Sequence, residues 1–419
     1  MKRFVQKKFR LSVVAILSTF LMLGSSAHSE ALDLGPKAKY IISINPSARA
    51  AIETAIINAG GKIDKKYSYV FDGYTVELPS LIVAVVKKIP NILSLELDQT
   101  AFGLAIQNNQ TPTPSWGLDR TDQRGPVGGN SYVSSYGYRS AGAGSTIYIG
   151  DTGIYPHSDF GSRLSTSGYS AISDGNGTVD CNGHGTHVAS TAAGTTYGIA
   201  KNATLVPVRI LSCSGSGMYS QVLAGLDWIL SPENPNSKSK AVLNLSIGGP
   251  ISPALNSAIQ KLTNAGITVV AAAGNEATDA CTRSPASAPS AITVGATQIS
   301  ETPASFSNYG SCVDINAPGV SITGAWIGSA TATNTISGTS MATPHVAGAA
   351  AVYLGLTGAS VSQVANYLGS ESTKNTITGL KPNTVNNLLY VSPTDGGAPV
   401  VAPTVALNKI TDITHESAN

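Results

Sequence analysis

The sequence predicts an α/β fold in which a parallel sheet carries helices on both faces, preceded by a small α/β domain. Between residues 116 and 391, short continuous runs rich in valine and isoleucine alternate with helix-length segments. This alternation is typical of parallel strands that helices cover on both sides. Residues 38–104 instead follow the order β-α-β-β-α-β, which is typical of a small ferredoxin-like arrangement.

The first 29 residues have the pattern of a signal peptide. A positive segment, MKRFVQKKFR, precedes the apolar run LSVVAILSTFLMLG, and small residues around Ala27 and Ser29 offer a cleavage site. The apolar run is shorter than the roughly 20 residues of a spanning helix. We therefore expect export, with an uncleaved membrane anchor as the alternative.

The bulk composition excludes some classes of partner. The 419 residues are 42% hydrophobic and 12% charged, which allows a sizeable core. A formal net charge of +2 gives no broad electrostatic field. The composition therefore argues for neither nucleic acid nor a membrane surface as a partner.

The small domain contains four strand-like runs and two helix-like ones. We expect strands at KYIISI, KIDKKYSYV, YTVEL and LSLELD. One helix is expected in PSARAAIETAIINAGG, with Ser47 as a possible N-cap, and a second from Ser80 through VAVVKKI. A polar connector follows at residues 105–115.

In the larger domain we expect buried strands at 145–150, 203–211, 241–249, 266–274 and 291–297. Helices are expected at 186–194, 220–230 and 253–266. Ligands and catalytic groups of such sheets gather at the carboxyl ends of the strands. The tail 392–419, rich in proline, glycine and threonine, is interpreted as a linker or removable extension.

Three polar residues stand where this sheet predicts a site. Asp151 ends the first strand, His184 lies in NGHGTHVAS just before a helix, and Ser340 opens another helix in SGTSMATP. Individually, each fits a turn residue, a surface histidine or an N-cap. Together they supply a hydroxyl nucleophile, a base and an orienting carboxylate. Asn275, which follows a strand, could donate to an oxyanion or could be a left-handed turn residue.

Four cysteines, Cys181, Cys213, Cys281 and Cys312, indicate an oxidising compartment. They allow three pairings, among which the residues alone do not choose. A zinc site is a weaker alternative, because the sequence has no C-x-x-C pair.

The segments YIGDTGI, NGHGTHVAS, AAAGN and SGTSMATPHVAG resemble the signature segments of the subtilases, the subtilisin-like serine proteases. Their order in the chain is one by which that family is recognised. The resemblance covers residues 116–391 as a subtilisin-like peptidase domain and 38–104 as an inhibitory prosegment of the I9 type. WGLDRTDQR, SCSGSGMYS, SPASAPSAITVG and SFSNYGSCVDI are similar to the proteinase K and aqualysin-like branch.

The resemblance implies roles for individual residues. Asp151 would orient His184 as general base, Ser340 would attack a peptide carbonyl, and Asn275 with the Ser340 N–H would bind the oxyanion. His345 would face away from the reaction. The implied substrate edges are Ser214, Gly215, Ser216 and Gly217 on one side and Ser246, Ile247 and Gly248 on the other, with Ala272, Ala273 and Gly274 as the wall of the primary pocket.

Small uncharged walls imply a broad preference for apolar or aromatic side chains at P1, the substrate residue before the cleaved bond. One departure is Arg283, which stands where relatives often have an aromatic residue at the pocket floor.

The resemblance also implies disulfides Cys181–Cys213 and Cys281–Cys312. It implies a Ca²⁺ site from Asp314 and the carbonyls of Pro289 and Ala291, an oxygen set suited to that ion. Further acidic residues resemble parts of other calcium sites; these are Asp119, Asp122 and Gln123, with Gly129 replacing an expected acidic residue, and separately Asp174 and Asp180.

The sequence thus leads to the expectation of a secreted, monomeric serine endopeptidase that acts on proteins or peptides. We expect it to remove its own prosegment near Gln107, and the disulfides and calcium to slow its inactivation. A selective processing protease and a catalytically silent extracellular binding protein of the same fold are the alternatives.

Overall fold

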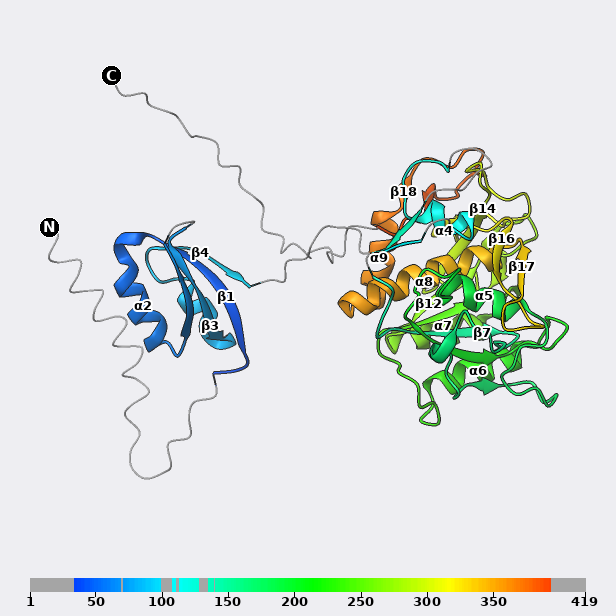
Figure 1. The fold of residues 1–419 in the computed structure, drawn as a ribbon, viewed down its shortest axis with the longest axis horizontal. Helices are drawn as coiled ribbons and strands as arrows, with labels where there is room; N and C mark the ends of the chain where they lie inside the picture. Colours follow the sequence, from blue (N-terminus) through cyan, green and yellow to red (C-terminus); the bar gives the residue numbers. More distant parts are fainter. Residues whose placement is uncertain are drawn as a thin grey trace, which may run out of the picture. The chain divides into compact units, whose positions relative to one another are not determined.

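The computed structural model describes residues 34–68, 71–98, 108–110, 113–127, 135–138 and 140–392. The chain divides into two units, Met1–Ala101 and Phe102–Asn419, each considered by itself (Figure 1). The signal segment 1–29, the expected cleavage near Gln107, Gly129 and the tail after Ser392 lie outside the described residues. Within those ranges, no helix combines the length and apolar character needed to cross a bilayer.

The first unit is an antiparallel four-stranded sheet with helical segments between its strands. The strands β1 (Lys37–Ile44), β2 (Lys62–Tyr67), β3 (Gly73–Pro79) and β4 (Ile92–Leu97) lie in the order β2-β3-β1-β4. The helices α2 (Arg49–Asn58) and α3 (Val83–Val86) follow the short 3-10 turns η1 (Pro46–Ala48) and η2 (Ser80–Ile82).

Asn45, rather than the expected Ser47, caps this unit's first helical segment. Its Oδ1 accepts hydrogen bonds from Ser47 N (3.1 Å) and Ser47 Oγ (2.8 Å). The difference arises because a 3-10 turn begins two residues before the position expected from the apolar periodicity.

A nine-stranded sheet forms the centre of the second unit, with order β18-β19-β15-β14-β12-β10-β7-β9-β8. Its neighbouring strands run parallel except for the pair β18–β19. The predicted parallel α/β sheet is therefore confirmed. The strands are β7 (Thr146–Asp151), β8 (Tyr169–Ser170), β9 (Thr204–Arg209), β10 (Ala241–Leu245), β12 (Thr268–Ala272), β14 (Ile292–Thr297), β15 (Ile315–Pro318), β18 (Thr373–Lys374) and β19 (Asn387–Leu388).

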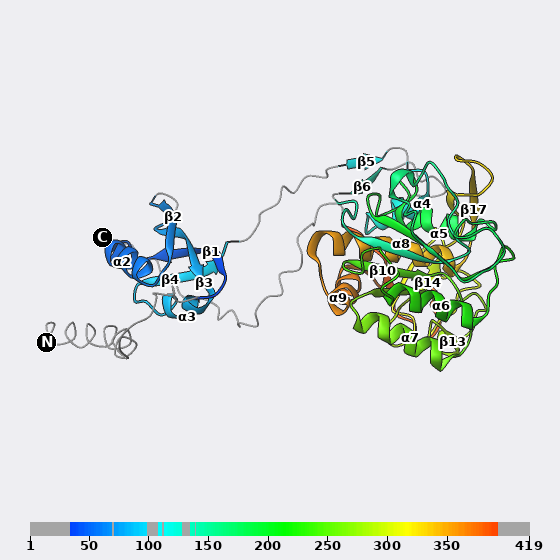
Figure 2. The same ribbon diagram turned by 90° about the horizontal axis from the view of Figure 1, so that it is seen from below.

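Helices cover both faces of this sheet (Figure 2). One apolar core lies between one face of the sheet and the helices α4 (Trp116–Thr121), α5 (His184–Ala193), α8 (Thr339–Thr357) and α9 (Val361–Glu371). A second core lies between the other face and the helices α6 (Tyr219–Leu230) and α7 (Pro253–Asn264). Side chains alternate between the two cores along β7: Ile147 and Ile149 enter the first, and Tyr148 enters the second. This burial on both faces explains why the strands are continuous apolar runs.

Three two-stranded ladders lie around the central sheet. They are β5 (Asn108–Gln110) with β6 (Tyr136–Tyr138), β11 (Gly249–Pro250) with β13 (Arg283–Ser284), and β16 (Ile322–Ala325) with β17 (Thr333–Ile336). Two short 3-10 turns, η3 (Gly161–Arg163) and η4 (Ala280–Thr282), also belong to this unit. The irregular connector expected at 105–115 is thus partly a strand. Pairing with β6 satisfies its backbone, and Lys201 Nζ donates to Gln110 Oε1 (3.0 Å).

Both disulfides have the pairing that the family resemblance implied. Cys181 is bonded to Cys213 and Cys281 to Cys312, with Cα–Cα distances of 5.0 and 5.3 Å. All four sulfurs are thereby used, which removes the zinc alternative. In the chain-entropy model, closing a loop of this size stabilises a protein by roughly 3 kcal/mol.

Candidate active site

A hydrogen bond between a buried carboxylate and an imidazole lies at the carboxyl end of β7. Asp151, the last residue of β7, is fully buried, and its Oδ1 lies 2.7 Å from His184 Nδ1. Thr152 N donates to the same oxygen at 2.7 Å. His184 itself begins α5, two residues before the start expected at 186. Because Nδ1 is engaged with the carboxylate, Nε2 is the ring nitrogen left for proton transfer.

The surroundings of His184 favour its protonated form. Burial lowers the pKa of the imidazole, but the charge of Asp151, its hydrogen bond and the charge of Asp180 raise it. The net result is a pKa above the usual 6.5. The imidazolium that would form on accepting a proton is therefore stabilised.

Asp180 organises the loop that leads into α5. Its Oδ2 accepts hydrogen bonds from Thr186 N (2.9 Å) and Thr186 Oγ1 (2.6 Å). Its Oδ1 accepts from Thr152 Oγ1 (2.8 Å) and from the N–H groups of Asn182 (2.9 Å) and Gly183 (3.0 Å). Sequence reasoning treated Asp180 only as a cation ligand. A carboxylate just before a helix was the signal of its capping role.

Close backbone packing fixes the position of His184 as well. A Cβ at residue 185 would lie 2.2 Å from Gly153 O, so only glycine fits there. Gly185 N donates to Thr152 Oγ1 at 2.9 Å. The first turn of α5 is thereby held against the residues that follow β7.

Ser340 is the second residue of α8 and makes a reciprocal contact with the end of β10. Its Oγ donates to Ser246 O at 3.1 Å, and Ser246 Oγ donates to Ser340 O at 2.9 Å. Within the described residues, no hydrogen bond joins the Ser340 hydroxyl to His184. A hydroxyl rotates readily, and contacts between catalytic groups often tighten only when substrate binds.

His184 and Ser340 line one groove of about 490 Å³. Both predicted substrate edges, residues 214–217 and 246–248, also line it. The other lining residues are Asn182, Leu211, Tyr219 and Val222. The Cys181–Cys213 bond joins the loop before His184 to the segment that carries the first edge.

The predicted pocket wall is held next to Ser340 through Thr339 but does not line this groove. Ala272 and Ala273 are buried at the end of β12, and Gly274 N donates to Thr339 Oγ1 at 3.2 Å. None of the three is among the residues that line the groove. Their role beside a substrate stays a prediction.

Asn275 is held by Thr339, the residue before Ser340. Its Oδ1 accepts hydrogen bonds from Thr339 N and Thr339 Oγ1, both at 2.8 Å. A Cβ at Gly338 would lie 3.5 Å from Ser340 N and 3.6 Å from Asn275 Nδ2. Two donors therefore converge on the open side of Gly338, an arrangement suited to an oxyanion. Asn275 is not the left-handed residue here; Gly274 is, with φ of 104°.

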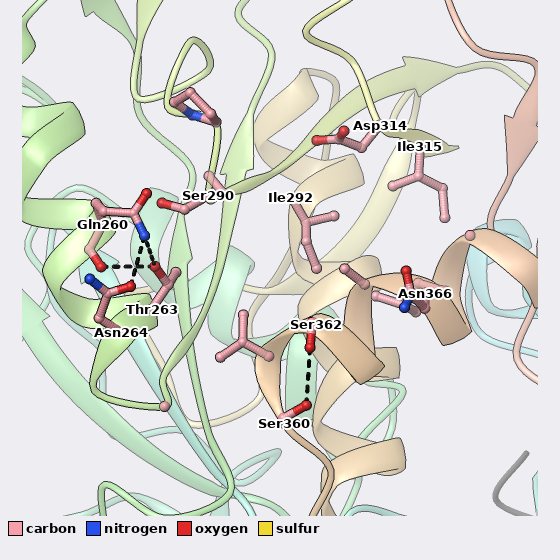
Figure 3. Close-up of a pocket in the computed structure, with 17 residues that line it drawn as sticks. Gln260, Thr263, Asn264, Ser290, Ile292, Asp314, Ile315, Ser360, Ser362 and Asn366 are labelled. Atoms are coloured by element: carbon pink, nitrogen blue, oxygen red, sulfur yellow. Dashed lines mark hydrogen bonds between the residues drawn. The ribbon is translucent and has the colours of Figure 1, made fainter. Parts of the chain in front are cut away.

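The three residues expected to bind calcium all line another cavity, of about 740 Å³. Pro289, Ser290, Ala291 and Asp314 line it, and Figure 3 shows Asp314 and Ser290 across the cavity from Ser360. Asp314 Oδ2 accepts from Thr293 N at 2.8 Å. The Ser290 hydroxyl is buried and, within the described residues, has no hydrogen-bond partner. These oxygen donors fit a hard cation.

The other aspartates are engaged in protein contacts. Asp174 forms an ion pair with Arg209, and the oxygens of Asp180 hold the α5 loop. Asp174 also lies near Cys181 and Cys213, but these sulfurs are disulfide-bonded.

Asp119 and Asp122, from the second set that resembles a calcium site, are close enough to influence each other. Burial raises the pKa of Asp122 to about 7, opposed by a hydrogen bond from Gly137 N, and the charge of Asp119 raises it further. Gln123 O accepts a hydrogen bond from Arg120 Nη1 at 2.6 Å.

Comparison with known proteins identifies the family. Residues 142–389 match the sequence model of a protein family that is described as "Subtilase family". The chain belongs to the subtilases. An "Extracellular serine proteinase" of Thermus sp. (strain Rt41A) is 49% identical over 334 residues, 79% of this chain and 78% of that protein. "Subtilisin-like protease 2" of Pseudogymnoascus destructans is 41% identical over 407 residues, 91% and 98% of the two chains.

A solved structure, that of a cold adapted subtilisin-like serine proteinase, is 46% identical and has a TM-score of 0.61. The match covers 66% of this subtilase and 97% of that chain. The fold is therefore subtilisin-like, and the enzyme is a serine endopeptidase.

Two further histidines of this subtilase are buried without charge beneath the site. His187 Nε2 lies 3.0 Å from Ile322 O, and His345 Nδ1 lies 2.8 Å from Met341 O. Burial lowers the pKa of each to about 4. His345 thus makes a hydrogen bond within its own helix, α8, rather than with His184 or Ser340.

These histidines predict a loss of stability in acid. Each binds a proton more readily after unfolding, because its folded pKa of about 4 lies below the usual 6.5. Their contribution is complete above pH 6.5 and is lost as the pH falls towards 4, by roughly 3 kcal/mol for each.

The measurement is the free energy of unfolding against pH, followed by tryptophan fluorescence in a Ser340→Ala background that prevents self-digestion. His345→Gln should flatten the slope between pH 6.5 and 4. Equal slopes with and without His345 would contradict the assignment.

Proposed function

We propose that this chain is a secreted, self-processing serine endopeptidase whose triad is Asp151, His184 and Ser340. The observation that carries the proposal is the 2.7 Å contact between the buried Asp151 carboxylate and His184, in the groove that Ser340 also lines. In the acylation step, Ser340 Oγ attacks the substrate carbonyl carbon while His184 Nε2 takes the hydroxyl proton. His184 then returns that proton to the leaving amine.

Asn275 Nδ2 and Ser340 N act on the carbonyl oxygen as it becomes negative. The two Thr339 hydrogen bonds to Asn275 Oδ1 support this role, because they turn the amide N–H₂ away from Thr339. Ser340 N lies in the first turn of α8, whose dipole also favours negative charge. Water then hydrolyses the acyl-enzyme, with His184 as base.

The substrates are extended proteins or peptides. Segments 214–217 and 246–248 face the same groove, so a peptide can pair with both as an added strand. We propose a broad preference for apolar or aromatic P1 side chains, based on the small residues Ala272, Ala273 and Gly274. A panel of peptides that differ at P1 distinguishes this enzyme from a selective processing protease.

The first unit acts as an I9-type inhibitory prosegment of an enzyme in the proteinase K and aqualysin-like branch. Its β-α-β-β-α-β order and the two sequential disulfides support this proposal. The pattern of residues 1–29 and the disulfides support export to the extracellular space. We propose that the mature enzyme is a monomer.

The test compares the intact mass of the secreted product for wild type and Ser340→Ala. The wild-type chain should lose its prosegment near Gln107, and the variant should retain it because it lacks the nucleophile. Ser337→Ala, at an exposed serine in the same segment, is the matched control and should be processed. Identical trimming of wild type and Ser340→Ala would show that another protease matures the chain, and would leave the silent binding protein as the next hypothesis.

We also propose a structural Ca²⁺ held by Asp314 and the carbonyls of Pro289 and Ala291. Ser290, which lies between Pro289 and Ala291 in the sequence, supports it, because its buried hydroxyl lacks a partner among the described residues. A bound cation stabilises the connection between the segment before β14 and Asp314, which precedes β15.

Calcium should therefore raise the thermal unfolding midpoint of the Ser340→Ala protein above its value in chelator. At a concentration about 100 times the dissociation constant, the gain would be about 2.7 kcal/mol. Asp314→Asn should reduce this shift, whereas Asp227→Asn, at an exposed position of α6, should not. An equal calcium-induced shift in both variants would contradict the site.

A further inference from the structure

Arg283 lies beside the substrate groove, although it does not line the groove described above. It pairs with Pro250 in the β11–β13 ladder, two residues beyond the predicted edge 246–248. Tyr219, which lines the groove, donates its hydroxyl to Pro250 O (2.7 Å) and Ser284 O (3.3 Å). Burial raises the pKa of Tyr219, and the positive charge of Arg283 opposes this rise.

The nearest charged partner of Arg283 is Glu276, the residue after Asn275. Arg283 Nε and Glu276 Oε2 are 3.7 Å apart, too far for a hydrogen bond. Nε is buried and, among the described residues, has no hydrogen-bond partner. Glu276 Oε2 instead accepts from Asn308 Nδ2 at 2.7 Å. The carboxylate is therefore already hydrogen-bonded, while Arg283 retains donors for another acceptor.

These two charges connect the segments that flank Ser340. On one side Ser340 contacts Ser246, which leads into Gly249 and β11. On the other, Thr339 holds Asn275, which leads into Glu276. Arg283 contacts the first segment through the ladder and the second through Glu276. A Cβ at Gly274 would lie 2.7 Å from Glu276 Oε2, so this charged pair lies against the predicted pocket wall.

We propose that Arg283 is a specificity-determining residue that binds the carboxylate of a glutamate side chain at P1, with Glu276 as its competing partner. The proposal rests on the proposed function, because it needs Ser340 to be the nucleophile. The methylene groups of glutamate would follow the small residues Ala272, Ala273 and Gly274, and the carboxylate would receive the guanidinium donors. Charge-assisted hydrogen bonds of this kind favour arginine.

Acidic rather than basic side chains are favoured for two reasons. The positive charge of the Arg283 guanidinium repels lysine or arginine at P1. Glu276 is 44% exposed, so its charge is screened by water, and its Oε2 accepts a hydrogen bond from Asn308. The acidic preference is superimposed on the apolar one and does not replace it.

The Cys281–Cys312 bond helps to hold Arg283 in place. Cys281 lies in η4, two residues before Arg283, and Arg283 N donates to Ala280 O. The backbone that carries the guanidinium is thus fixed at both the disulfide and the β11–β13 ladder.

The experiment measures kcat/KM of wild type, Arg283→Gln and Glu276→Gln on succinyl-Ala-Ala-Pro-X p-nitroanilides, where X is Phe, Gln or Glu. The readout is the ratio of the Glu to the Phe substrate, at a pH at which the glutamate is ionised. Arg283→Gln should lower this ratio about tenfold, the size expected for one charge-assisted hydrogen bond. Glu276→Gln should raise it, because the competing carboxylate is removed. The Gln substrate, a neutral isostere, should respond less than the Glu substrate.

Arg124→Gln is the matched control. Arg124 is also a partly exposed arginine in an ion pair, but its partners are Glu371 and the ring of Tyr390. Its ratio should equal that of wild type.

An unchanged ratio in Arg283→Gln, or an equal loss with both substrates, overturns the proposal. If the Arg283→Gln enzyme does not fold, the Glu276→Gln variant decides the matter. A Glu/Phe ratio in that variant no higher than in wild type overturns the proposal. Failure of the proposed function is distinct, because then wild type would cleave none of the three substrates.

Discussion

The site depends on one hydrogen bond, between the buried carboxylate of Asp151 and Nδ1 of His184. The sheet fixes the first partner, because β7 lies between β9 and β10 and ends at Asp151. The start of α5 fixes the second, because Asp180 satisfies the N–H groups of the loop and first turn around His184. The Cys181–Cys213 bond then joins that loop to one edge of the groove. The imidazole is thereby already oriented, which would reduce the reorganisation that the proposed reaction requires.

Hydrogen bonds to neighbouring segments also hold Ser340 in place. Ser246 and Thr339, both buried, make paired hydrogen bonds with Ser340 and with Asn275. These contacts connect β10, the end of β12 and the start of α8, three elements that are distant in sequence. The charged pair Arg283–Glu276 lies just beyond these segments. The proposed catalysis and the proposed selectivity therefore depend on the same three connected segments, although different side chains are responsible for each.

Much of this arrangement could be predicted from the sequence. The buried strands are apolar runs because they are covered on both faces, and Asp151, His184 and Ser340 stand at the ends of elements in small-residue segments. The role of Thr339 could not be predicted, because only the tertiary fold brings it near Gly274 and Asn275. The capping role of Asp180 was missed although its position just before α5 signalled it. The β5 strand was missed because its sequence, Asn-Asn-Gln, has no apolar residues, and its partners β6 and Lys201 come from later parts of the chain. The sequence shows Arg283 where relatives often have an aromatic residue. Its contact with Glu276 could not be predicted, because it depends on the β11–β13 ladder.

The most direct test of the central claim is the pH dependence of kcat/KM for wild type and Asp151→Asn. Asp151 raises the pKa of His184 and holds its reactive tautomer, so its replacement should lower kcat by about 10⁴ and move the acid limb to lower pH. The loss must occur with the protein still folded, as shown by an unchanged circular dichroism spectrum. An Asp151→Asn enzyme with wild-type kcat and an unmoved acid limb would contradict the account, because His184 would then not depend on this carboxylate.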